Sequence, residues 1–332
     1  MWRETYTEVW LLAMFGAACG APHVAPSATG DVPAGLTLDG ATIASVVPAS
    51  DGHVVWPPMV DSHVHLALDP VANELEKHGV LVAVDLAAPE RAMHDQVPIE
   101  ILRSGPMLTH PDGYPLDEWG SDGYGTGCSD AACVRAAVDR LANEGARVIK
   151  IAGDADGLAV ALMPVAVEAA HAKHLKVAIH ALSDAGALAG AQAGCDILAH
   201  TPVEPLAPTT IAAWKGRAVI STLAAFGGSP TAVSNLTQLR AAGLTVLYGT
   251  DLGNIKPTGP SHEEVALLRE AGLDDAAITA AMTTTPVAFW GLDYAIAPHH
   301  PATFLVLDGD PRSNIEHLLA PVDVWRAGRS VR

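Results

Sequence analysis

The stretch Met59-Val-Asp-Ser-His63-Val-His65 is an apolar run that ends in two histidines separated by one residue. Side chains alternate between the two faces of a β-strand, so these imidazoles point to the same side and can bind one ion. Later apolar runs also end in potential metal ligands: Lys150 in 147–151, His180 in 176–180, His200 in 196–200 and Asp251 in 245–251. A single histidine at a strand end is more often a satisfied polar residue or a helix cap than a ligand, but the ordered set predicts a divalent-metal site.

The order of apolar runs predicts the fold class. Runs rich in β-branched residues occur near 59–65, 80–86, 99–102, 147–152, 176–180, 196–200, 218–223 and 245–250. Ala-rich, helix-forming stretches separate most of them, and eight alternating units favour an α/β fold built as a (β/α)8 TIM barrel. Such a barrel gathers the ends of its strands around one mouth, where the segment 109–127 is expected to form a long loop.

On these residues the chain resembles the metal-dependent amidohydrolase superfamily, and most of all its imidazolonepropionase-like and prolidase-like branch. The resemblance extends from about residue 35 to the C-terminus, and its main carriers are 60–66, 148–151, 178–181, 197–200 and 249–254. It implies a barrel formed by 59–293. It also implies a small β-sandwich domain formed by both chain ends, at 35–58 and 294–332.

The resemblance implies a two-metal centre, with zinc as the expected metal and a carboxylated lysine as the bridging ligand. The implied metal ligands are His63, His65, Lys150, His180, His200 and Asp251. Asp251 is also the implied catalytic residue, which moves a proton from a metal-bridged hydroxide to the leaving nitrogen.

Lys150 has an environment that agrees with this role. It lies between Ile149 and Ile151, and a lysine in a water-poor site loses part of its preference for the charged form. A neutral amine can react with carbon dioxide to give an anionic carbamate. The alternatives are a barrel-interior lysine paired with a carboxylate, or an unmodified lysine beside a one-metal site on His63, His65, His180 and Asp251.

These residues favour a hydrolase that cleaves amide or peptide-like C–N bonds in dipeptides, N-acyl amino acids or cyclic amides. A mononuclear deaminase or a lactonase of the same fold is the nearest alternative. A lipoprotein that binds metal or a small ligand without catalysis is another, although a binding site alone does not need the proton shuttle Asp251.

Substrate-binding residues are less clearly encoded. His110, Tyr114 and Tyr124 follow the third predicted strand, together with Trp119, in a chain with only 5% aromatic residues. We expect them to form a wall of the substrate site, with packing of the loop onto the barrel as the alternative explanation.

The N-terminus suggests export. Residues 1–19 have a short apolar region that ends in Gly16-Ala-Ala-Cys19, and 20–34 have the composition of a linker. We expect an exported periplasmic or membrane-anchored lipoprotein with a lipid on Cys19; the alternative is a cytoplasmic enzyme with an apolar extension. Cys128 and Cys133 are close enough in sequence for a local disulfide in an oxidising compartment.

Composition limits the partners. The chain has 332 residues, 49% of them hydrophobic, and a formal net charge of −18, which argues against nucleic-acid binding. A small-molecule substrate is expected, with membrane contact only through the lipid anchor. A homo-oligomer is a further expectation, because relatives in the resembled family often associate.

Overall fold

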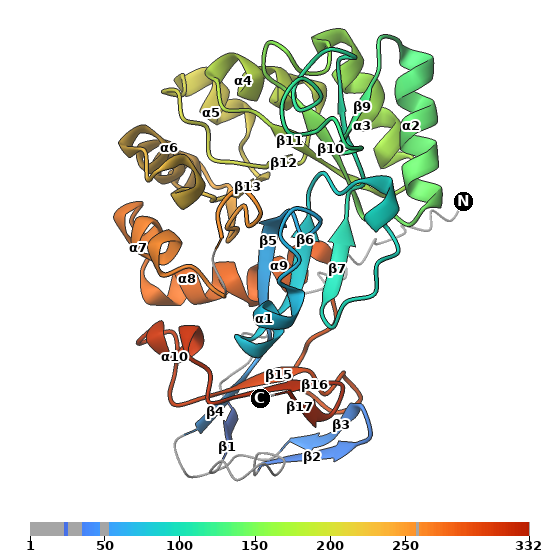
Figure 1. Ribbon diagram of the computed structural model, residues 1–332. Helices are drawn as coiled ribbons and strands as arrows, with labels where there is room; N and C mark the ends of the chain where they lie inside the picture. Colours follow the sequence, from blue (N-terminus) through green and yellow to red (C-terminus); the bar gives the residue numbers. More distant parts are fainter. Residues whose placement is uncertain (1–22, 26–34, 47–52, 257–258, 332) are drawn as a thin grey trace, which may run out of the picture.

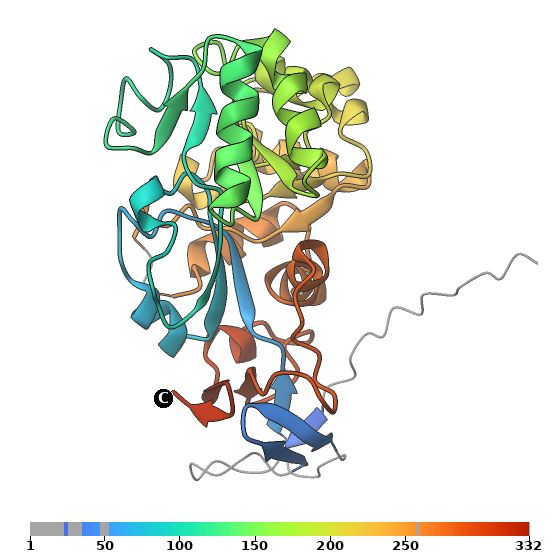
Figure 2. The same ribbon diagram turned by 90° about the vertical axis from the view of Figure 1, so that its right-hand side faces the viewer.

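The computed structural model describes residues 23–25, 35–46, 53–256 and 259–331. Helices lie around the outside of a set of parallel strands, and a smaller sheet from the two chain ends lies below them (Figure 1). The view turned by 90° shows the same two parts (Figure 2). The predicted signal peptide, Cys19 and most of the linker lie outside the described residues. Within them, no helix is long and apolar enough to cross a membrane.

The larger sheet has seven parallel strands in the order β14-β13-β12-β11-β10-β8-β9. Its strands are β8 (Met107–Thr109), β9 (Gly125–Gly127), β10 (Val148–Ala152), β11 (Lys176–His180), β12 (Ile197–Leu198), β13 (Ala218–Ile220) and β14 (Thr245–Leu247). The helices that follow these strands are α2 (Ala131–Asn143), α3 (Met163–His171), α4 (Asp184–Ala193), α5 (Pro208–Ala213), α6 (Pro230–Ala241), α7 (His262–Glu270), α8 (Asp275–Met282) and α9 (Thr284–Trp290). This confirms the predicted α/β class with a parallel sheet.

A second parallel sheet has three strands in the order β5-β6-β7. These are β5 (Met59–Val64), β6 (Val80–Asp85) and β7 (Glu100–Arg103), with α1 (Ala72–Lys77) after β5. On one side, Asp251 N donates to His63 O at 2.8 Å, and His65 N donates to Leu252 O at 2.6 Å. On the other side, Arg147 N donates to Arg103 O at 2.9 Å. Backbone hydrogen bonds therefore connect both edge strands of the smaller sheet, β5 and β7, to segments of the larger sheet next to β14 and β10.

The chain passes from the smaller sheet to the larger one at 104–106. Pro106 has no backbone N–H, and Gly105 has a φ of 70°, so regular strand pairing stops there. The third predicted strand, 99–102, therefore ends with β7, and β8 is an additional strand that was not predicted. The segment 109–127 is not wholly a loop as predicted, because its end forms β9, which pairs with β8.

Alternation along the strands sorts apolar side chains into two buried clusters. In β10, Ile149 and Ile151 belong to the cluster that contacts the helices, whereas Val148 belongs to an inner cluster. The inner cluster draws on strands of both sheets and is formed by Val84, Leu86, Leu102, Val148, Ala178, Ile197, Ala199, Ala218, Ile220, Leu247 and Trp290. A dry apolar layer therefore lies beneath the predicted metal ligands.

The two chain ends share a five-stranded antiparallel sheet in the order β1-β4-β15-β16-β17. Its strands are β1 (His23–Ala25), β4 (His53–Trp56), β15 (Phe304–Leu307), β16 (Asp323–Arg326) and β17 (Arg329–Ser330), and α10 (Glu316–Leu319) lies between β15 and β16. A separate hairpin, β2 (Leu36–Asp39) and β3 (Thr42–Val46), packs Ile43 against Phe304 and Trp325.

Helix α7 begins with a side-chain cap that the sequence indicates. Ser261 Oγ accepts a hydrogen bond from Glu264 N at 3.2 Å. We expect Ser261→Ala to lower the free energy of unfolding by about 1 kcal/mol, because one N–H of the first turn loses its partner. Urea denaturation measures this change. Ser234→Ala, on the exposed face of α6, is the matched control and should change stability by less than about 0.5 kcal/mol; equal losses in both variants would contradict the capping role.

Candidate active site

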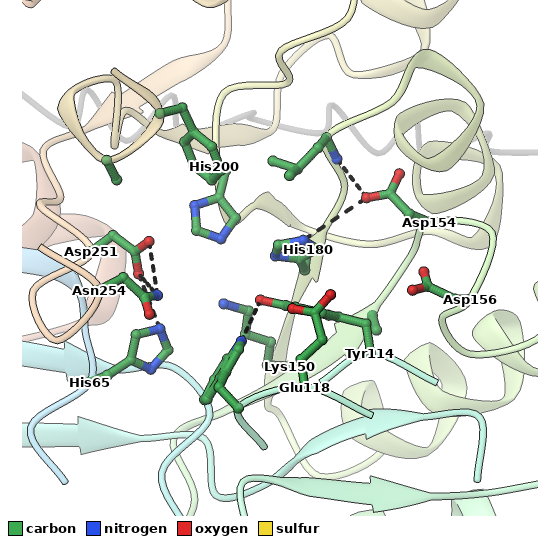
Figure 3. A pocket seen from close by; sticks show the side chains of 15 residues that line it. His65, Tyr114, Glu118, Lys150, Asp154, Asp156, His180, His200, Asp251 and Asn254 are labelled. Carbon is green, nitrogen blue, oxygen red and sulfur yellow. Dashed lines mark hydrogen bonds and ion pairs between the residues drawn. The ribbon is translucent and has the colours of Figure 1, made fainter. Parts of the chain in front are cut away.

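The six predicted metal ligands lie together at the carboxyl ends of the parallel strands. Lys150 is in β10, His180 ends β11, and His200 follows β12 by two residues. All six side chains are buried, from His63 at 0% exposed to His180 at 7%. Figure 3 shows five of them, His65, Lys150, His180, His200 and Asp251, around one centre. The structure therefore brings together residues that are up to about 190 positions apart in sequence.

Three of these side chains form the tightest group. His63, His65 and Asp251 each offer a ligand atom, and these atoms lie within 4.8 Å of one another. His65 Nε2 is 3.1 Å from Asp251 Oδ1, and His63 Nε2 is 3.5 Å from the same oxygen. Lys150 Nζ lies 3.0 Å from His63 Nε2, which connects β10 to this group.

The other two histidines complete the arrangement. The ring of His200 lies 4.4 Å from that of His63 and 4.8 Å from that of His180, measured between centroids. His180 Nε2 is 4.0 Å from Asp154 Oδ2. The four imidazoles thus form a continuous chain of rings beside the lysine amine.

Burial sets the protonation of these groups. It lowers the pKa of His180 to about 3, and it lowers the pKa values of His63 and His200 well below the usual range, so the rings are neutral. Burial also lowers the pKa of Lys150 to about 7. Burial alone would raise the pKa of Asp251, but the neighbouring His63, His65 and Lys150 outweigh it and hold that pKa below its ordinary value.

Surrounding groups orient three of the ligands. Ala199 O accepts a hydrogen bond from His63 Nδ1 at 2.8 Å, which leaves Nε2 free to face Asp251. His200 Nδ1 lies 3.0 Å from Thr222 Oγ1. Asn254 Nδ2 donates to both carboxylate oxygens of Asp251, at 3.1 and 3.2 Å. Asp251 itself has a φ of 60°, a left-handed conformation that aspartate tolerates better than most residues.

The site opens into a cavity of about 400 Å³. Tyr114 stacks on His180 with ring centroids 4.5 Å apart, and its hydroxyl accepts a hydrogen bond from Trp119 Nε1 at 3.1 Å. Burial raises the pKa of Tyr114, so the hydroxyl is neutral and its proton is available to a ligand. Figure 3 shows the labelled lining residues. Besides the ligands, the lining comprises Tyr114, Glu118, Trp119, Ala152, Asp154, Asp156, Leu182, Ala225, Phe226 and Asn254.

Two of the three predicted substrate residues do not reach this cavity. His110 is exposed, and its Nδ1 accepts a hydrogen bond from Asp112 N. Tyr124 is buried beneath the loop, where it packs against Trp119 and Arg91. Tyr124 therefore packs the loop onto the barrel, which was the alternative explanation, and does not line the substrate site. Tyr114 does line the cavity, as expected.

The residues fit a divalent metal on their own chemistry. Neutral imidazoles and an ionised carboxylate are suitable donors, and they face one another in a buried place. Among the described residues, Nδ1 of His65 and Nδ1 of His180 are buried without a hydrogen-bond partner. Buried nitrogen atoms of this kind are costly unless something binds them.

Sequence reasoning missed a buried carboxylate that supports the site from α7. Glu264 is fully buried, and its carboxylate accepts hydrogen bonds from Leu223 N at 3.0 Å and Ala224 N at 2.7 Å. These residues directly follow Thr222, which contacts His200. The only sequence signal was the spacing Ser261-x-x-Glu264, which also describes an ordinary capping box.

Comparison with known proteins supports the fold. No family model matches the chain. An uncharacterized protein of Mycobacterium tuberculosis is 27% identical over 270 residues, which cover 67% of this chain and 70% of that protein. A crystal structure of a Xaa-Pro dipeptidase with bound methionine has a TM-score of 0.74 at 17% identity, over 89% of this chain and 94% of that one.

Two further solved structures have the same overall fold. A prolidase complexed with N-methylphosphonate-L-proline has a TM-score of 0.72 at 17% identity, over 90% of this chain and 94% of that one. Phenylurea hydrolase B has a TM-score of 0.68 at 17% identity, over 91% of this chain and 94% of that one. The chain therefore shares the overall fold of these solved prolidase and hydrolase structures.

Glu264 makes stability depend on pH. Burial raises its pKa from 4.5 to about 7, so between these values the folded protein keeps a proton that the unfolded chain has released. The stability linked to this proton is present below about pH 4.5 and is lost as pH rises through about 7. The quantity to compare is the free energy of unfolding of the parent minus that of Glu264→Gln. We expect this difference to fall by on the order of 2–3 kcal/mol from about pH 5 to about pH 8.

Urea denaturation of both proteins at the two pH values measures this difference. Glu270→Gln, an exposed residue on the same helix, is the control and should follow the parent at both pH values. A difference between parent and Glu264→Gln that stays constant or grows with pH would contradict the assignment.

Proposed function

We propose that this chain is a metal-dependent hydrolase of amide or peptide-like C–N bonds, with dipeptides, N-acyl amino acids or cyclic amides as substrates. The observation that carries the proposal is the convergence of four buried imidazoles, one carboxylate and one buried amine on a single point beside an open cavity. The fold it shares with a Xaa-Pro dipeptidase and a phenylurea hydrolase supports the same reaction class.

We assign the ligands to two metal positions. His63, His65 and Asp251 would hold the first ion, because their donor atoms already lie within 4.8 Å of one another. His180 and His200 would hold the second ion, expected to be zinc like the first. Lys150, whose Nζ lies 3.0 Å from His63 Nε2, would supply the ligand shared by the two ions.

Lys150 can become that bridge by carboxylation. Its pKa of about 7 leaves a large fraction of the amine neutral at physiological pH. The nitrogen lone pair forms a bond to the carbon of carbon dioxide, and one proton is released to solvent. The product is a carbamate whose single negative charge is shared by two oxygens, and anionic oxygens are good ligands for divalent metals.

The bound metal would supply Lewis acidity, which lowers the pKa of water and polarises a carbonyl. Asp251 would accept a proton from the attacking water and return it to the leaving nitrogen, so water and amide give acid and amine. Asn254 holds both oxygens of this carboxylate and orients it during the transfer. The neutral hydroxyl of Tyr114 would donate a hydrogen bond to the substrate.

A one-metal hydrolase is the second candidate, in the form of a deaminase or a lactonase. The compact group of His63, His65 and Asp251 favours it, because this group could hold one ion without any change to Lys150. The same attack on carbon then serves C–N or C–O bonds.

The architecture and location follow as further proposals. Hydrogen bonds at both edges and a shared inner apolar cluster support one closed (β/α)8 barrel over 59–293. Packing of the β2–β3 hairpin on the terminal sheet supports a small sandwich of 35–58 and 294–332.

The disulfide between Cys128 and Cys133 supports export to an oxidising compartment. Residues 1–19 would then be the signal peptide that precedes the 20–34 linker, with Cys19 as the lipid anchor.

The role of Asp251 can be separated from metal binding. We expect Asp251→Asn to lower kcat by about 10²–10⁴-fold, because amide cannot accept the proton, while most of the bound metal remains on the histidines. A panel of dipeptides, N-acyl amino acids, cyclic amides and lactones, combined with elemental analysis, measures both quantities.

Asp308→Asn, exposed on the terminal sheet, is the control and should match the parent. Parent-like turnover in Asp251→Asn would contradict the proton-transfer role. No hydrolysis of any member of the panel by the metal-loaded parent would contradict the proposed function.

A further inference from the structure

We propose that the substrate carries a positively charged group, an ammonium or a guanidinium, which binds at the outer end of the cavity. This inference rests on the proposed function, since it concerns the same cavity. It specifies that the scissile carbonyl lies at the buried ligands while the cation lies between Glu118, Asp156 and the aromatic wall.

The charged side chains along the cavity have one sign. Apart from the metal ligands, the charged residues that line it are Glu118, Asp154 and Asp156. No arginine is among the lining residues that the structure describes, and the one lysine is the buried Lys150. A substrate carboxylate would therefore find no fixed cation outside the centre, whereas a substrate cation would find carboxylates.

Asp154 has a structural task and is not available as a free carboxylate. It accepts hydrogen bonds from Leu182 N at 2.8 Å, and from Ser183 N at 3.1 Å and Ser183 Oγ at 2.5 Å. Glu118 and Asp156, by contrast, are exposed and show no ion pair within the described part of the chain. These two carboxylates are therefore available to a ligand.

The fold brings together the two loops that carry these carboxylates. Glu118 belongs to the loop between β8 and β9, and Asp156 belongs to the loop after β10. A Cβ atom at Gly113 would lie 1.8 Å from Asp156 O, so only glycine lets the two loops approach this closely. Figure 3 shows Glu118 and Asp156 on the same side of the centre as His180, with Asp251 on the opposite side.

The rest of the lining suits a cation bound beside an amide. Tyr114, Trp119 and Phe226 line the same cavity, and aromatic faces attract ammonium and guanidinium groups. His180, 7% exposed, also lines this cavity, and its buried Nδ1 has no hydrogen-bond partner among the described residues, so it can bind an added ion or ligand. The cavity would therefore favour a molecule that places an amide at its buried end and a cation at its acidic outer end.

A pair of probes tests the charge preference without any need for catalysis. Benzylammonium and benzyl alcohol have similar shapes and differ in charge. We expect the purified full-length, metal-loaded protein to bind benzylammonium at least about fivefold more tightly in calorimetry at low salt. The ratio should approach one in the Glu118→Gln/Asp156→Asn double variant, and it should shrink at high salt in the parent.

The matched control removes the same charge from the same region. Asp112 and Asp117 are exposed, belong to the loop before β9 and do not line the cavity. Asp112→Asn/Asp117→Asn should keep the parent's ratio. Equal binding of the two probes by the parent, no binding of either, or an equal loss in both double variants would overturn the inference.

Substrates extend the same test to turnover. Ala-Lys is compared with Ala-norleucine, and Lys-Ala with norleucine-Ala, so each pair differs by one ammonium. We expect one lysine dipeptide to have a kcat/KM at least about fivefold higher than its partner, and the Glu118→Gln/Asp156→Asn variant to lose that advantage. If benzylammonium is preferred but no peptide is cleaved, the proposed peptide hydrolysis fails while the charge inference stands. If both members of each pair are cleaved at equal rates, the proposed peptide hydrolysis stands and the charge inference fails.

Discussion

The burial of four imidazoles, an amine and a carboxylate around one point is the constraint on which this structure depends. Polar groups without partners are costly in an apolar interior, so each needs a bond to protein or to a bound ion. The backbone supplies part of this, as when Ala199 O accepts from His63 Nδ1. Nε2 of His63 and Nε2 of His65 both face the Asp251 carboxylate, and this set of buried donors suits a divalent cation.

Meeting this requirement organises the surrounding elements. The alternation in β10 places Val148 and Lys150 inward and two isoleucines against the helices, which combines a dry core with a reactive amine. Glu264 reaches from α7 to the loop that contains Thr222, and Thr222 contacts His200. The Glu264 carboxylate in α7 thus supports the position of His200 through the segment 222–224.

Much of this could be predicted from sequence because strand patterns are local. All eight predicted apolar runs contain a strand at their expected place, and the ordered ligands lie at the strand ends as the pattern indicates. The supporting contacts could not be predicted in the same way. Asn254, Thr222 and Glu264 act across turns or between elements far apart in sequence, and their residue types are common in loops and helix starts. His110 and Tyr124 were misplaced because the path of the 109–127 segment depends on its pairing with β8.

Metal content is the quantity that most directly tests the central claim of a bridged metal centre. Elemental analysis of the purified chain should find about two divalent ions per molecule. The Lys150→Ala variant, shown to be folded by circular dichroism, should hold one or none, and Lys173→Ala, an exposed lysine, should match the parent. A folded parent without bound metal, or equal metal content in the parent and Lys150→Ala, would contradict this account.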